Sequence, residues 1–193
     1  ATTLALEFSP ELIGLVEQAQ RLSQASGGAF DITIAPLVDR WGYGPSGPRD
    51  TPPTDAEIAE LLEHVGYPKL VADAADKTLK KKHPELRIDL GALLQGYAAD
   101  RLAAILDRQQ AGDCLIDVGG ELLARGAWTV AVENPAQPGR PLASFTLHDG
   151  ALATSGVYRK PKGEGPPETR HILSPKTGRP VDAEEFHTAA AYQ

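Results

Sequence analysis

The sequence contains almost none of the residues that build disulfide frameworks and metal clusters. Its 193 residues include one cysteine, Cys114, so an internal disulfide and any site made of several cysteines are excluded. Cys114 lies in the apolar run CLIDV, which favours a small buried side chain over a reactive thiol. Methionine is absent, even at the first position, so missing targeting signals say little about the compartment.

Positive charge, aromatic residues and long apolar runs are also scarce. The net charge is −7, aromatic residues make up 6%, and Lys80–Lys82 is the one cationic run, so nucleic acid is disfavoured as a partner. No apolar stretch approaches the roughly 20 residues that cross a bilayer. With 41% apolar and 23% charged residues, the chain is typical of one globular domain with a substantial core.

Three segments carry helix signals. SPELIGLVEQAQRLSQASGG begins with Ser9 as N-cap and Pro10 at the first helical position, and it ends at a glycine pair. TDAEIAELLEHVG carries a capping box of Thr54 and Glu57. The third helix is expected from about residue 91 to 110, with a buried stripe formed by Leu94, Tyr97, Ala98, Leu102, Ile105 and Leu106.

Strand signals dominate the second half of the chain. KLVAD and KTLKKK are expected to be short strands joined by a turn, and AFDITIAPLVDRWGYG is expected to be part strand and part apolar turn. CLIDVGGELLARG, WTVAVEN, LASFTLHDG and ALATSGVY follow as strands. Helices that come first and hairpin-length links later predict an α+β fold, with a mainly antiparallel sheet and packed helices.

Common catalytic motifs are missing. The five histidines include no pair at the i,i+4 spacing of a helical metal site, and the sequence has no G-x-S-x-G elbow, P-loop or G-x-G-x-x-G. Four glycine-rich turns beside carboxylates remain: SGGAFD, IDLGALLQG, LIDVGGE and ATSG. Their backbone amides can approach an anion, and Asp31, Asp89 and Asp117 can hold a hydroxyl, a ring N–H or a cation. Tight turns with capping aspartates explain the same pattern equally well.

These turns, in this order, resemble the FAD:protein FMN transferase (ApbE-type) family. The resemblance runs from about Ser9 to Val181 and rests on SGGAFDITIAPLVDRWGYG, IDLGALLQGYAAD, LIDVGGEL, WTVAVENP, ALATSGVYR and HILSPKTGRPV. It implies a T-fold-like domain that uses FAD and Mg²⁺. The implied enzyme transfers FMN from FAD to a threonine or serine of a target protein and releases AMP. Such targets are subunits of flavin-bearing redox complexes.

The resemblance also assigns residues. It implies FAD contacts at Ala29, Phe30, Asp31, Asp89, Gln95 and Ile172, a metal contact through the main-chain oxygen of Ala92, and a proton acceptor at His171. Phe30, Trp41 and Tyr43 are available for an isoalloxazine slot, with core packing favoured for Trp41. Gly96, inside the third helix, is expected to allow close approach to the dinucleotide or to the sheet, with packing alone as the alternative.

Several positions depart from the family pattern. Gln95 stands where many relatives carry lysine, so weaker FAD binding is expected. Val157 and Ser174 stand where aspartates are common. Residues 1–193 are expected to form a single flavin-transferase-like domain that lacks the family's N-terminal strands and its C-terminal metal-binding helix. Thr154, in DGALATSG, is expected at a strand edge lining the site rather than as a flavinylation acceptor.

Two other functions remain open from the sequence. One is an FAD-binding protein without transferase activity, or a related hydrolase that gives FMN and AMP. The other is a structural domain whose glycine turns are only turns. The resemblance implies a periplasmic location, on the outer face of the cytoplasmic membrane, with membrane contact only through an N-terminal lipid anchor; a cytoplasmic location is the second choice.

Overall fold

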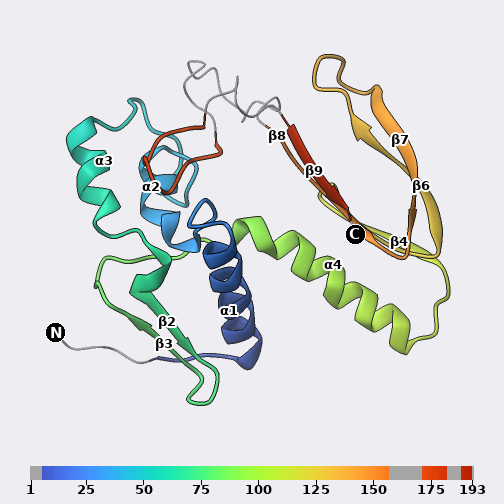
Figure 1. The fold of residues 1–193 in the computed structure, drawn as a ribbon, viewed down its shortest axis with the longest axis horizontal. Helices are drawn as coiled ribbons and strands as arrows, with labels where there is room; N and C mark the ends of the chain where they lie inside the picture. Colours follow the sequence, from blue (N-terminus) through green and yellow to red (C-terminus); the bar gives the residue numbers. More distant parts are fainter. Residues whose placement is uncertain (1–5, 157–170, 182–187, 193) are drawn as a thin grey trace. The chain divides into compact units, whose positions relative to one another are not determined.

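The computed structural model describes residues 6–156, 171–181 and 188–192, whose helices and antiparallel strands make an α+β fold (Figure 1). The chain divides into two units, which are described separately. Unit 1 comprises residues 1–90 and 162–181, and unit 2 comprises residues 91–161 and 182–193. Every strand pairing in the described residues is antiparallel, as the sequence predicted. The T-fold topology and the single domain stay predictions.

Unit 1 packs helices against a small sheet. Its elements are β1 (Leu6–Glu7), α1 (Pro10–Ala25), the 3₁₀ helix η1 (Ile32–Ile34), α2 (Ala35–Arg40), α3 (Asp55–Leu62), the 3₁₀ helix η2 (Tyr67–Lys69), β2 (Leu70–Asp73) and β3 (Thr78–Lys81). The sheet order is β1-β3-β2. The expected start of α1 is confirmed, since Ser9 accepts a hydrogen bond from the amide of Leu12 and Pro10 is its first residue. The capping box of α3 is also confirmed.

The strand expected within AFDITIAPLVDRWGYG is absent from unit 1. Residues of this stretch form η1 and α2 instead. Asp31 caps η1 by accepting the amide of Thr33, and Pro36 stands in the first turn of α2, where a missing N–H costs nothing. These local hydrogen bonds override the β-branched composition that indicated a strand.

Unit 2 is a helix laid on antiparallel strands. It contains α4 (Gly91–Arg108), β4 (Cys114–Val118), β5 (Glu121–Arg125), β6 (Ala127–Glu133), β7 (Pro141–His148), β8 (Ala151–Gly156) and β9 (Thr188–Tyr192). One sheet has the order β4-β5-β8-β9, and β6 and β7 form a second, two-stranded sheet. The strands expected in the second half of the chain are confirmed within the described residues. The loop expected at RKPKGEGPPETR lies outside them.

The buried face of α4 differs from the predicted stripe. Ala99 and Ala103 are buried against Ile116 and Leu123, and Leu106 and Cys114 pack around this cluster. Leu94, Leu102 and Ile105 are 50%, 45% and 46% exposed, so the prediction was wrong for these three residues. The physical reason is size: alanine side chains let the helix approach β4 and β5 closely, and that contact outweighs the number of large apolar side chains on the adjacent face.

Candidate functional site

In unit 1, the SGGAFD turn follows α1 directly. Gly27 and Gly28 have φ values of 58° and 79°, in the left-handed region that glycine adopts without strain. The amide of Gly28 donates to the carbonyl of Ser23 at 2.7 Å, which ends the helix. The chain then turns so that Ala29 is exposed and Phe30 half-buried, with the Phe30 amide bonded to the Ser26 hydroxyl.

Asp31 is fully engaged by the fold. Its Oδ1 accepts from the amide and the hydroxyl of Thr33 at 2.8 and 2.7 Å, and its Oδ2 accepts from the amide of Tyr67 at 2.6 Å. Thr33 in turn accepts the amide of Gly66 at 2.7 Å. Asp31 is 6% exposed, so this buried network fixes the turn between residues 29 and 33 relative to η2. The FAD contact expected at Asp31 stays a prediction, and the capping role offered as its alternative is confirmed.

Asp89 lies beside the same turn. Its amide donates to the carbonyl of Ile32 at 2.7 Å, and its side chain is half-buried. This bond joins the RIDLG segment to Ile32, the residue directly after the SGGAFD segment. Unit 1 therefore brings together two of the acids that the resemblance assigns to FAD.

His171 and Ile172 enter unit 1 from the HILSPKTGRPV segment. A bridge between Leu173 and Pro180 shapes this segment into a tight loop, in which the Ile172 carbonyl accepts the amide of Val181 at 3.0 Å. Leu173 is buried against Leu37 and Val65. These contacts anchor the loop on α2, next to the positions where His171 and Ile172 begin it.

The imidazole of His171 meets the ring of Tyr43 edge-on, with ring centroids 6.4 Å apart and an interplanar angle of 71°. Desolvation by the surrounding chain lowers the pKa of His171 below its ordinary value of 6.5. The lowered pKa favours the neutral ring, which is the state that a general base needs in order to accept a proton.

Trp41 has the packing role that the sequence favoured. It packs with Leu37, Val65 and Leu173, and its indole N–H donates to the carbonyl of Gly178 at 2.8 Å. Ser174, where relatives commonly carry aspartate, accepts the amides of Lys176 and Thr177 and so caps the loop. Val157 lies outside the described residues.

In unit 2, the first turns of α4 lie against the turn between β4 and β5. The side-chain amide of Gln95 points at the carbonyl of Gly119, with an N–O distance of 3.4 Å. Gly119 has φ 64°, and a β-carbon there would come within van der Waals overlap of the Gln95 amide nitrogen. Ala92 stands one turn earlier, exposed, with its carbonyl inside the first turn of the helix. The structure thus places Ala92 and Gln95 on the helix start beside the DVGG turn.

Asp117 has a structural role in this turn. Its Oδ1 accepts the amide of Gly120 at 2.8 Å, which is the turn function that the sequence left open for it.

Gly96 faces open space. Among the described residues, no heavy atom lies within 4 Å of the position where a β-carbon would be added. Within the described residues of unit 2, the hypothesis that Gly96 allows close approach of α4 to the sheet is therefore wrong, and no neighbouring strand packs on this position. Its approach to a bound dinucleotide stays a prediction.

Glu121 is a residue that sequence reasoning missed. Its Oε2 is buried and has no hydrogen-bond partner among the described residues, while the backbone of Thr154 in β8 bonds to the carboxyl. Burial raises the pKa of Glu121 above its ordinary value of 4.5, and the Thr154 contact opposes this shift. The residue belongs to the motif LIDVGGEL, so the sequence could place it near the turn, but no sequence signal predicted its burial.

The described residues do not form a side-chain metal site: no three of their His, Cys, Asp or Glu side chains gather closely enough to hold an ion. Across the described part of the chain, no helix has both the length and the apolar character needed to cross a membrane.

Known proteins resemble the chain over most of its length. At 31% identity over 186 residues, it matches the FAD:protein FMN transferase of Haemophilus influenzae, covering 91% of this chain and 54% of that protein. At 33% identity over 181 residues, it matches the enzyme of the same name from Vibrio cholerae, covering 90% and 54%. The chain thus spans about half the length of the curated relatives it matches.

Solved structures agree with these sequence matches. The flavin transferase ApbE from Vibrio cholerae superposes with a TM-score of 0.85 at 30% identity, covering 100% of this chain and 62% of that one. The ApbE protein from Thermotoga maritima gives 0.84 at 28% identity, covering 96% and 61%. The sequence model of the ApbE family matches residues 1–188, so the chain belongs to the ApbE family.

Proposed function

We propose that the protein takes part in flavin transfer, moving the FMN half of FAD onto a hydroxyl of an acceptor protein with release of AMP. The observation that carries this proposal is the family match over residues 1–188, with relatives named FAD:protein FMN transferase. Its physical support is the set of glycine turns, with Ala29, Phe30 and Asp31 in unit 1 and Gln95 in unit 2. The acceptors are subunits of flavin-bearing redox complexes.

The reaction exchanges a phosphoanhydride bond of FAD for a phosphoester bond to the acceptor. The oxygen of an acceptor threonine or serine bonds to the FMN-side phosphorus, the bond from that phosphorus to the bridging oxygen breaks, and AMP leaves with the electron pair. His171 takes the hydroxyl proton, for which its lowered pKa keeps the imidazole neutral. Within unit 1, the resemblance assigns the positioning of the dinucleotide to Asp89 and the SGGAFD turn. Within unit 2, it assigns a further contact to Gln95, whose side-chain amide is a hydrogen-bond donor.

Mg²⁺ belongs to this proposal by resemblance only. The described residues supply no three-ligand cluster for it, so no step above depends on the ion. We also propose, by the same resemblance, a periplasmic location on the outer face of the cytoplasmic membrane. We keep both as expectations that a transfer assay with Mg²⁺ or EDTA, and fractionation of cells that express the protein, can check.

The test incubates the chain with FAD and a flavin-acceptor subunit, then follows acceptor-bound flavin fluorescence in a denaturing gel and AMP by chromatography. Transfer predicts both products in equal amounts. FAD binding without AMP would favour the non-transferring flavoprotein, and AMP with free FMN in the absence of acceptor would favour the hydrolase. His171→Asn is expected to slow AMP release at least tenfold with little change in FAD affinity.

A further inference from the structure

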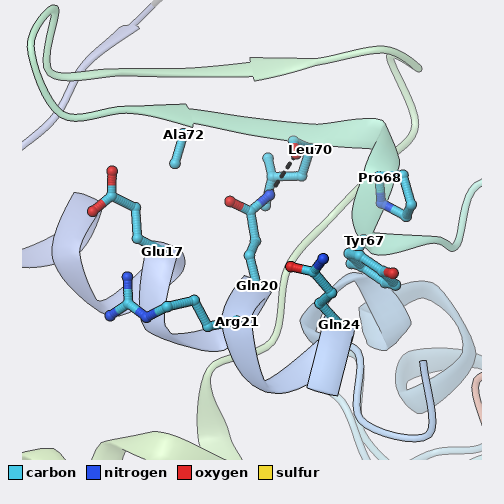
Figure 2. A pocket seen from close by; sticks show the side chains of 8 residues that line it. All are labelled: Glu17, Gln20, Arg21, Gln24, Tyr67, Pro68, Leu70 and Ala72. Atoms are coloured by element: carbon cyan, nitrogen blue, oxygen red, sulfur yellow. Dashed lines mark hydrogen bonds between the residues drawn. The ribbon is translucent and has the colours of Figure 1, made fainter. Parts of the chain in front are cut away.

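A shallow groove in unit 1 plays no part in the site described above. It has a volume of about 480 Å³ and lies between α1 and β2 (Figure 2). Gln20, Arg21 and Gln24 line it from α1, and Leu70 and Ala72 line it from β2. Because most of this lining is polar, the groove suits a ligand that carries many hydrogen-bonding groups.

The strand that borders the groove is an edge strand in the described sheet. In the order β1-β3-β2, β2 has β3 on one side only. Lys82 donates to the carbonyl of Lys69 at 2.8 Å, and the register continues with Val71 opposite Lys80. Hydrogen-bonded and non-hydrogen-bonded pairs alternate along an antiparallel ladder, so the peptide groups of Leu70 and Ala72 point away from β3 and toward the groove. At the end of η2, the N–H of Leu70 already donates to the carbonyl of Tyr67.

The outward carbonyl of Leu70 already accepts a hydrogen bond from an amide N–H, as it would from a further strand. The side-chain amide of Gln20 donates to the carbonyl of Leu70 at 2.5 Å, a contact drawn in Figure 2. A carboxamide N–H occupies here the place of a main-chain N–H. The outer edge of β2 is therefore arranged to bind peptide groups, with the N–H and C=O of Ala72 next along the strand.

The groove also leads toward the flavin turn. Tyr67 lines its end, and the amide of this residue bonds to Asp31. A β-carbon placed on Gly28 would lie 3.8 Å from the Tyr67 ring and 4.0 Å from the side chain of Lys176. A chain lying along β2 would thus end beside SGGAFD, where the FMN half of FAD is expected.

We propose that the outer edge of β2 binds an extended segment of the acceptor polypeptide, which adds a strand through the Ala72 amide group and delivers its hydroxyl residue toward the SGGAFD turn. The proposal rests on the proposed function, because a protein substrate is what makes a peptide-binding edge useful beside a flavin site. Main-chain pairing gives affinity with little sequence demand, while Gln24 and Arg21 contact alternate side chains of the segment.

The probe is an array of synthetic decapeptides, each with one central threonine and randomised flanks, screened against the full chain. The tightest binder is then titrated by fluorescence anisotropy, and exchange of the Ala72 amide is followed by NMR. Binding is expected to protect that amide. Ala72→Pro removes the outward N–H without removing a β2–β3 hydrogen bond, so it is expected to weaken binding at least tenfold. Ala72→Thr, which keeps the N–H, is the matched control and is expected to change affinity less than threefold.

A second measurement tests the proposal even if the Ala72→Pro variant does not fold. Two peptides of the same sequence are titrated into the unchanged protein, one N-methylated at its odd-numbered residues and the other at its even-numbered residues. One peptide is expected to lose binding and the other to keep it, because only alternate amides of an added strand face β2. Array peptides that do not bind, equal loss in both methylated peptides, or self-association of the chain through β2 would overturn the proposal.

The control for the proposed function is a separate FAD titration. Peptide binding without FAD binding would sink flavin transfer while leaving the peptide edge. FAD binding without peptide binding would leave flavin transfer in place and overturn the peptide-binding edge.

Discussion

The two glycine turns assigned to the ligand differ in how their side chains are used. In unit 1, the buried Asp31 accepts three hydrogen bonds from Thr33 and Tyr67, which makes SGGAFD a rigid element of the fold. In unit 2, Gln95 reaches Gly119 by one long contact of 3.4 Å on an exposed helix start. The comparison teaches that the first turn is a rigid part of the fold, in which the amides from Gly27 to Phe30 already donate within the chain, whereas the second has an adjustable side chain at Gln95.

The largest expected effect is a loss of stability when the hydrogen bonds of the SGGAFD turn are removed. Asp31→Ala leaves the buried amide of Tyr67 and the Thr33 groups without their acceptor, so a loss of about 2–4 kcal/mol in the free energy of unfolding is expected. Urea unfolding measures it. Asp31→Asn, which keeps one acceptor oxygen, is the control and is expected to lose less. A loss below about 1 kcal/mol in Asp31→Ala, together with abolished FAD binding, would instead make Asp31 a ligand residue.

A medium effect is expected at the second turn. Gly119→Ala places a methyl group against Gln95 at a positive φ, so about 1–2 kcal/mol of destabilisation is expected. Gly120→Ala, also at positive φ but with open space around its β-carbon, separates backbone strain from the clash. In a double-mutant cycle measured by thermal unfolding, Gln95→Ala should recover part of the Gly119→Ala loss and none of the Gly120→Ala loss. Equal recovery in both would contradict the contact.

A smaller effect of opposite sign is expected at Gly96. Since a β-carbon there meets open space in a helix, Gly96→Ala should stabilise the protein by about 0.5–1 kcal/mol. If FAD approaches this side of α4, the same change lowers FAD affinity. Stability comes from urea unfolding and affinity from flavin fluorescence. Unchanged FAD affinity would remove Gly96 from the ligand site.

The smallest effect concerns pH. Burial raises the pKa of Glu121 in the folded protein, so the folded state binds this proton more tightly than the unfolded state does. Its contribution to stability is therefore greatest below the unfolded pKa and falls as the pH rises through the folded pKa. Glu121→Gln cannot ionise, so its Tm relative to the unchanged protein should rise from pH 4 to pH 8. A difference that stays constant across this range would contradict the buried position of the carboxyl.

The sequence predicted well what local chemistry decides. The caps at Ser9 and Thr54 and the α+β class are confirmed, because each depends on residues close together in the chain or on periodicity. The strand prediction failed at η1, where Asp31 caps the 3₁₀ helix through the amide of Thr33 and the β-branched composition pointed instead to a strand. The further bond from Tyr67 to Asp31 is long-range, and no local pattern reveals it.

The prediction of the buried face of α4 failed for a related reason. Which face of an amphipathic helix is covered depends on the strands it meets, and Ala99 and Ala103 fit β4 and β5 better than Leu94 and Leu102 do. The candidate site could be located by its motifs, while the roles of single residues depended on contacts. Asp31 and Asp117 serve the turns, and Glu121 became visible only through its enclosure.

The most direct test of the central claim is a titration of FAD into the chain, followed by flavin fluorescence, with FMN titrated in parallel. If the chain takes part in flavin transfer from FAD, FAD should saturate and bind at least tenfold more tightly than FMN. Gln95→Ala should weaken FAD binding and leave FMN binding nearly unchanged. FAD binding no tighter than FMN, or no binding of either, would contradict the account and leave these glycines as turns of the fold.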